Sequence, residues 1–82
     1  MDDDILFADI DENETKTYFR DTLLSLIEEN EISQGKLAYM VGVSQQTISK
    51  YLSGECLPSF MMIKKLSIAL NCSVEDFYSY DS

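Results

Sequence analysis

The sequence predicts an all-α fold of five helices, and three observations lead to this class. Apolar residues recur at spacings of three and four, as expected where one face of a helix is buried. Ser33 and Ser44 each precede such a stretch, where a hydroxyl can accept a hydrogen bond from a free backbone amide of a helix start. Gly42 and Gly54 follow two stretches, and glycine readily adopts the left-handed conformation that ends helices.

The first helix is expected over residues 15–29. Its candidate buried residues have helical spacing: Phe19, Leu23, Leu26, Ile27 and Tyr18. Glu28, Glu29 and Glu31 crowd the C-terminal end of this helix, where the helix dipole disfavours negative charge.

The second and third helices are expected over residues 34–41 and 45–52, joined by a tight turn. Their inward-facing residues would be Leu37, Ala38, Val41, Val43, Ile48 and Leu52. Ala38 is small at the position where the two helices must approach closely. These segments therefore predict a helix, a turn and a second helix with a polar outer face.

A fourth helix is expected over residues 60–71, with Ser59 as its cap. Its buried residues would be Ile63, Leu66, Ala69 and Leu70. A fifth helix would begin after Ser73, because Glu75 and Asp76 then lie in its first turn, where acidic side chains complement the helix dipole. Val74 and Phe77 would close the core.

Residues 1–14 form an acidic arm in front of the helical domain, which spans 15–82. The arm contains seven acidic residues, no basic residue and a small apolar group at Ile5, Leu6, Phe7 and Ile10. Such a composition buries too little apolar surface to offset the entropy of ordering, so we expect the arm to be flexible. Residues 1–31 hold eleven of the 15 acidic residues against two basic ones, Lys16 and Arg20, so this segment accounts for the net charge of −9.

Composition argues against several classes of function. The chain has 82 residues and no histidine, and it lacks phosphate-binding loops and catalytic triads, so we expect no enzyme activity and no cofactor. Cys56 and Cys72 lack the spacing of a zinc site and are expected to be free thiols. No apolar run approaches the roughly 20 residues of a membrane span, and no secretory signal is recognisable, so a cytoplasmic location is expected.

The residues around the predicted turn resemble those of the helix-turn-helix domain of the phage repressor, Cro and XRE-type DNA-binding family. The similarity extends over about residues 18–77 and includes Ile32, Ser33 and Gln34, Leu37 and Ala38, Gly42 to Ser44, Ile48 and Ser49, Gly54, Pro58, Leu66, Ala69 and Leu70, and Ser73 to Phe77. This resemblance implies a repressor-like domain that regulates transcription by binding double-stranded DNA, with the helix at 45–52 in the major groove.

The resemblance also implies which residues contact DNA. Matching the family's base-contacting positions are Gln45, Gln46, Ser49 and Lys50. Backbone contacts are expected from Ser33, Gln34, Lys36, Thr47, Tyr51 and Ser53, with Tyr39 as a further candidate. Gln34 would also support Gln45. A glutamine amide suits the adenine edge, and a lysine can donate to guanine.

Two alternatives remain open at this point. A polar outer helix face is also typical of a solvated helix, and the net charge has the wrong sign for approaching phosphates. Glu55, in the loop after the third helix, would repel a phosphate. The chain could therefore be a protein-interaction module on the same fold, resembling an antagonist or antitoxin subunit, whose acidic arm contacts a basic partner or inhibits DNA binding. For the DNA-binding form we expect a homodimer, which doubles the contacts.

Overall fold

A computed structural model describes residues 12–78, and these contain helices but no strand. The elements are α1 (Glu12–Glu29), α2 (Gln34–Val41), α3 (Gln45–Ser53), α4 (Phe60–Ala69) and a 3-10 helix, η2 (Val74–Phe77). The all-α prediction is confirmed for this part of the chain. Most of the predicted acidic arm lies outside the described residues.

Three helix boundaries and the type of the last element differ from those predicted. One of the boundaries is the end of α3, which lies at Ser53 rather than at residue 52. Helix α1 begins at Glu12 rather than at residue 15, and α4 ends at Ala69 rather than at residue 71. Helix α4 stops there because Asn71 adopts a left-handed conformation, with φ of 58°. The predicted fifth α-helix is wrong, since residues 74–77 form a single 3-10 turn. Its start is held by the Ser73 backbone N–H, which donates to Asp76 Oδ2 at 3.1 Å.

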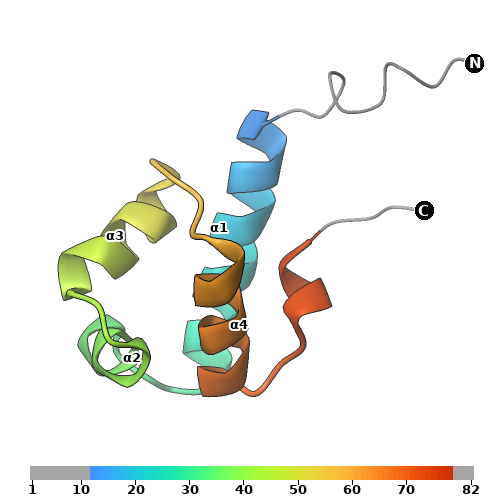
Figure 1. Ribbon diagram of the computed structural model, residues 1–82. Coiled ribbons are helices and arrows are strands. Elements are labelled where there is room, and N and C mark those ends of the chain that lie inside the picture. The colour runs from blue at the N-terminus through green and yellow to red at the C-terminus, as the bar shows by residue number, and fades with distance from the viewer. Residues whose placement is uncertain (1–11, 79–82) are drawn as a thin grey trace, which may run out of the picture.

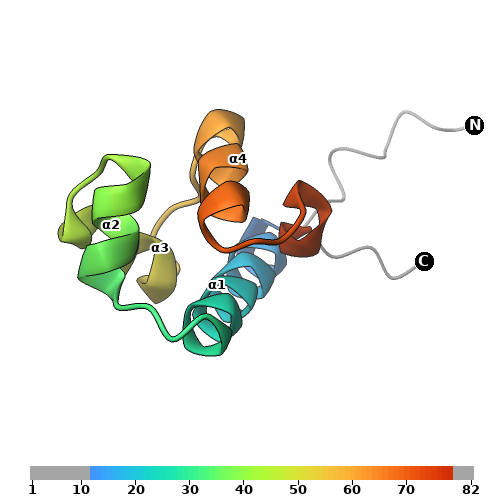
Figure 2. The ribbon, with the colours of Figure 1, turned by 90° about the horizontal axis from the view of Figure 1, so that it is seen from below.

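The helices are arranged with the α2–α3 pair at one end of the molecule (Figure 1). Helices α1 and α4 lie between this pair and η2, which is at the opposite end in both views (Figure 2). Helix α3 contacts both α2 and α1, whereas α4 contacts α2 and η2. Helices α1 and α4 therefore support the α2–α3 pair, α1 through α3 and α4 through α2.

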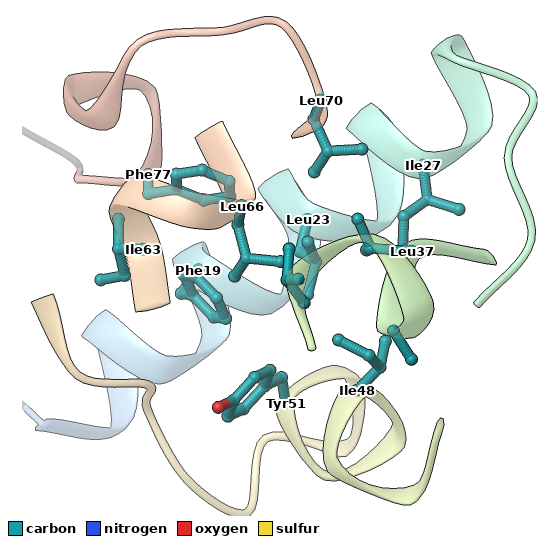
Figure 3. Packing of buried hydrophobic residues seen from close by; sticks show 12 residues of the cluster. Phe19, Leu23, Ile27, Leu37, Ile48, Tyr51, Ile63, Leu66, Leu70 and Phe77 are labelled. Carbon is teal, nitrogen blue, oxygen red and sulfur yellow. The ribbon is translucent and has the colours of Figure 1, made fainter. Parts of the chain in front are cut away.

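All five elements contribute to one hydrophobic core (Figure 3). The ring of Phe19 in α1 lies 5.2 Å from that of Phe77 and 6.1 Å from that of Tyr51, measured between centroids. The buried apolar residues are Phe19, Leu23, Ile27, Leu37, Ala38, Val41, Ile48, Tyr51, Ile63, Leu66, Leu70 and Phe77. The remaining predicted core residues pack against this cluster while partly exposed: Leu26, Val43, Leu52, Ala69 and Val74. Tyr18 is exposed, so its assignment to the core was wrong.

Serine side chains start three of the helices, as predicted. The Oγ atoms of Ser33, Ser44 and Ser59 accept hydrogen bonds from backbone amides three residues on, at 3.0, 3.2 and 3.2 Å. Each bond satisfies an amide that has no partner within the helix. The helix starts are thus encoded locally.

All four α-helices end in the same hydrogen-bonding pattern, the Schellman motif. The left-handed residue of the motif is the first residue after α2 and α3 and the second residue after α1 and α4. These residues are Gly42, Gly54, Glu31 and Asn71. At the end of α1, the Glu31 N–H donates to Glu28 O and the next amide donates to Ile27 O. Glycine fills the left-handed position after α2 and α3, whereas after α1 and α4 a residue with a side chain must adopt it at a steric cost.

Replacing Glu31 with glycine should therefore stabilise the domain. Glu31 has φ of 53° and is exposed, so Glu31→Gly removes left-handed strain without opening a cavity. We expect the free energy of unfolding to rise by about 1 kcal/mol, measured by urea denaturation.

Two further variants separate conformation from charge. Glu31→Gln keeps the strain and removes only a carboxylate near the helix end, so its gain should be the smaller one. Gly54→Ala, at φ of 82°, should lose about 1–2 kcal/mol. Equal stabilities of Glu31→Gly and Glu31→Gln would contradict the conformational explanation.

Candidate nucleic-acid interface

The turn between α2 and α3 sets the direction of α3. Gly42 is left-handed, with φ of 80°, and the amide of Val43 donates to Ala38 O at 3.0 Å. The chain then reaches Ser44, whose side chain accepts from the Thr47 amide and lies 3.1 Å from the Thr47 hydroxyl. The turn is closed at both ends by hydrogen bonds, so α3 leaves α2 at a defined angle.

Helix α3 has one buried face and one exposed face. Ile48 and Tyr51 are buried in the core. The four predicted base-contacting residues are all exposed: Gln45, Gln46, Ser49 and Lys50. Their spacing of one and four residues puts them on one side of the helix. The structure therefore groups these side chains into one polar surface.

Gln34 joins this surface from the start of α2. Its Oε1 accepts a hydrogen bond from Ser49 Oγ at 3.1 Å, which links the two helices across the turn. The family resemblance implies that Gln34 supports Gln45, whereas the side-chain hydrogen bond of Gln34 in this structure is to Ser49. The Ser49 hydroxyl proton is therefore directed to Gln34.

Gln45 instead lies against Gly35. A Cβ atom added to Gly35 would be 3.3 Å from Gln45 Oε1, closer than ordinary van der Waals contact. The absence of a side chain at Gly35 thus leaves room for the Gln45 amide. This role of Gly35 was not predicted. A usable signal was a glycine in the first turn of a helix, where most other residues form helix better.

The predicted backbone contacts fall into different environments. Ser33 and Lys36 are exposed at the start of α2, with the Ser33 hydroxyl occupied as a cap. Thr47 is half-buried beside Ser44. The Ser53 hydroxyl lies 2.9 Å from Lys50 O and 3.2 Å from a carboxylate oxygen of Glu55. Ser53 is thus beside a negative charge, which makes it a poor phosphate contact.

The ring of Tyr51 belongs to the hydrophobic core. It is 8% exposed, and its ring meets that of Phe19 edge-on at an interplanar angle of 87°. Burial raises the pKa of the Tyr51 hydroxyl above its usual value, and Cys56 adds to the shift. The ring of Tyr51 therefore serves the core, and its contact with the DNA backbone stays a prediction.

Few cations surround the polar surface. Lys36 and Lys50 are exposed on α2 and α3, whereas the chain's single arginine, Arg20, pairs with Asp21 at 3.1 Å on α1. Among residues 12–78, no group of three or more potential ligands could hold a metal ion. Within the same residues, no helix is long and apolar enough to cross a membrane. The positive charge available to the surface is therefore that of two lysines.

Comparison with known proteins agrees with this geometry. The model of the helix-turn-helix family HTH_3 matches residues 23–77. An uncharacterized HTH-type transcriptional regulator of Bacillus subtilis (strain 168), YvzC, is 37% identical over 62 residues, which are 76% of this chain and 80% of YvzC. The chain belongs to the HTH_3 helix-turn-helix family.

Solved structures show the same fold. The SOS-response transcriptional repressor LexA from Eubacterium rectale superposes with a TM-score of 0.77 at 26% identity, covering 84% of this chain and 73% of that one. An HTH_3 family transcriptional regulator from Vibrio cholerae superposes with a TM-score of 0.75 at 22% identity. That match covers 82% of this chain and 38% of the longer one. The repressor-like architecture is therefore confirmed.

Gly35→Ala should move the Gln45 side chain and stabilise the fold at the same time. The added methyl group improves helix propensity by up to about 1 kcal/mol but displaces the nearby Gln45 amide. We expect a higher free energy of unfolding and shifted side-chain amide resonances of Gln45 in a nitrogen–proton NMR spectrum. Gln46 serves as the internal control, and unchanged Gln45 resonances would contradict the contact.

Tyr51 should make stability fall at high pH. The unfolded tyrosine has a pKa of about 10, and burial raises the pKa of Tyr51 in the folded state. The stabilising effect of this difference is therefore complete below pH 10 and is lost as pH rises through the folded pKa. We expect the free energy of unfolding to decline more steeply above pH 10 in the natural chain than in Tyr51→Phe. Parallel pH profiles of the two proteins would refute the assignment.

Proposed function

We propose that this chain is a sequence-specific, DNA-binding transcription regulator that reads the major groove with the outer face of α3. The observation that carries the proposal is that Gln45, Gln46 and Lys50 are exposed together on a helix held to the core by its opposite side. Membership of the helix-turn-helix family supports the same use of α3. The similarity of this chain to a transcriptional regulator and to a transcriptional repressor supports a role in regulating transcription.

The chemistry of these side chains suits base recognition. A glutamine amide has one donor group and one acceptor, which match N7 and N6 of adenine, and the Lys50 ammonium can donate to guanine O6 and N7. Gln34 and Ser49 already share a hydrogen bond, which lowers the cost of ordering them at the DNA. Because that bond uses Gln34 Oε1 as the acceptor, we infer that Gln34 donates its amide protons to a phosphate.

Phosphate contacts would come mainly from the start of α2. Ser33, Gln34 and Lys36 lie in its first turn, and the positive end of a helix dipole favours phosphate. Thr47 is a further candidate near the start of α3. With so few cations, the dependence on salt should be shallow, about 0.9 log units of affinity per log unit of salt for each phosphate neutralised.

We further propose that the regulator binds as a homodimer. A single domain with two lysines at the DNA holds few phosphates, and a second copy doubles the contacts. In helix-turn-helix dimers the two recognition helices lie about 34 Å apart and match a palindromic site. The selected DNA sequence should therefore be a palindrome.

Binding-site selection from a random DNA pool at low salt tests the proposal. We expect one enriched sequence, and the substitutions Gln46→Ala and Lys50→Ala should each weaken binding to it. Loss of one bidentate base contact corresponds to about 1–3 kcal/mol, or roughly 5- to 150-fold in affinity. Lys16→Ala, which removes the same charge from α1, is the matched control and should bind normally.

Two outcomes would overturn the proposal. One is that neither the full chain nor a chain without residues 1–14 enriches any DNA sequence from the pool. The other is that both α3 variants bind the enriched sequence as tightly as the natural chain. Co-purification of a basic protein in the first case would favour the protein-interaction module.

A further inference from the structure

The outward face of α4 is apolar, and nothing in the proposed DNA-binding surface uses it. Phe60, Met61 and Ile68 on this face are 65, 60 and 74% exposed. Lys64 and Lys65 lie between them and are also exposed. These five residues, which we call the α4 face, lie on one side of the helix because their spacings are one and four residues. Large apolar side chains grouped in this way are typical of a contact surface.

A shallow hollow extends the α4 face toward α2. It has a volume of about 270 Å³ and is lined by Met40, Lys65, Ile68 and Ala69. Pockets that hold small ligands usually measure about 300–1,000 Å³. The hollow is therefore better suited to one or two apolar side chains of a peptide than to a cofactor.

The charges of the α4 face indicate what kind of peptide it can accept. Within residues 12–78, Lys64 and Lys65 have no ion-pair partner. A second copy of the same face, related by a two-fold axis, would bring four lysines together and be repelled. The best partner is a segment that combines apolar side chains with carboxylates.

Residues 2–11 of this chain have that composition. Asp2, Asp3 and Asp4 are followed by the apolar Ile5, Leu6 and Phe7, and then by Asp9, Ile10 and Asp11. The segment directly precedes α1. Its ten residues can span up to about 33–36 Å, while α4 is ten residues long and so measures only about 15 Å. The segment is therefore long enough to run along the whole of α4, and its attachment to α1 keeps it on the same molecule.

We propose that residues 2–11 dock on the α4 face of the same molecule, where the exposed Phe60, Met61 and Ile68 supply the apolar surface that the segment itself lacks to offset its entropy of ordering. Apolar side chains of the segment cover Phe60, Met61 and Ile68 and enter the hollow, and its aspartates pair with Lys64 and Lys65. Docking holds part of the chain's excess negative charge at α4. The proposal does not depend on DNA binding, since it concerns a different surface.

Nitrogen–proton NMR spectra of the natural chain and of a chain without residues 2–11 test this docking. We expect deletion to shift the backbone amides of residues 60–68 as well as those at the start of α1, equally at low and high protein concentration. In a chain carrying Lys64→Glu and Lys65→Glu, the same deletion should leave residues 60–68 unchanged. The matched control is Lys64→Arg with Lys65→Arg, which keeps the positive charge. In this variant, deletion of residues 2–11 should still shift the amides of residues 60–68.

Ile68→Ser tests the apolar part of the contact. The side chain is 74% exposed, so the fold should be unaffected while the response to deletion weakens. The proposal would be overturned if deletion of residues 2–11 shifted only the amide resonances at the start of α1. It would also be overturned if the deletion shifted those of α3. Shifts at α4 that grow with protein concentration, with a dimer in sedimentation, would assign the contact to a second molecule and overturn docking within one chain.

Discussion

The structure depends on the packing of α3 against α1 through Ile48 and Tyr51. Helix α3 has nine residues, and isolated helices shorter than about 12–15 residues are marginal in water. The helix therefore owes its stability to its buried side, where Tyr51 meets the ring of Phe19, which in turn contacts Phe77. This aromatic group ties α3 to both α1 and the C-terminal 3-10 turn. The polar outer face is presented only while this inner face is packed.

Local signals made much of the fold predictable. Ser33, Ser44 and Ser59 start three helices because a cap requires only a hydroxyl and nearby amides. The two left-handed glycines were also recognisable. Asn71 was not, because asparagine reaches the left-handed region less often than glycine and the apolar Ala69 and Leu70 continue the helical pattern up to it. The short fifth element was predicted as a helix because its capping residues serve a 3-10 turn equally well.

The candidate site was less predictable because its details depend on contacts between helices. Tyr51 has a polar tip, and whether it faces solvent or the core is decided by the position of Phe19, 32 residues earlier in the chain. The bond between Gln34 and Ser49 and the space over Gly35 arise from the approach of α2 to α3. Sequence spacing placed the outer-face residues on one side of α3 but could not show which of them touch one another.

The separation of α3 into two faces also affects how such a domain can diverge in evolution. Gln45, Gln46 and Lys50 contribute nothing to the hydrophobic core, so mutations at these positions leave the scaffold intact. Ile48, Tyr51 and the Ser44 cap are constrained by folding. A lineage can therefore acquire a new target through a few changes at three codons, while selection for stability acts on the positions between them.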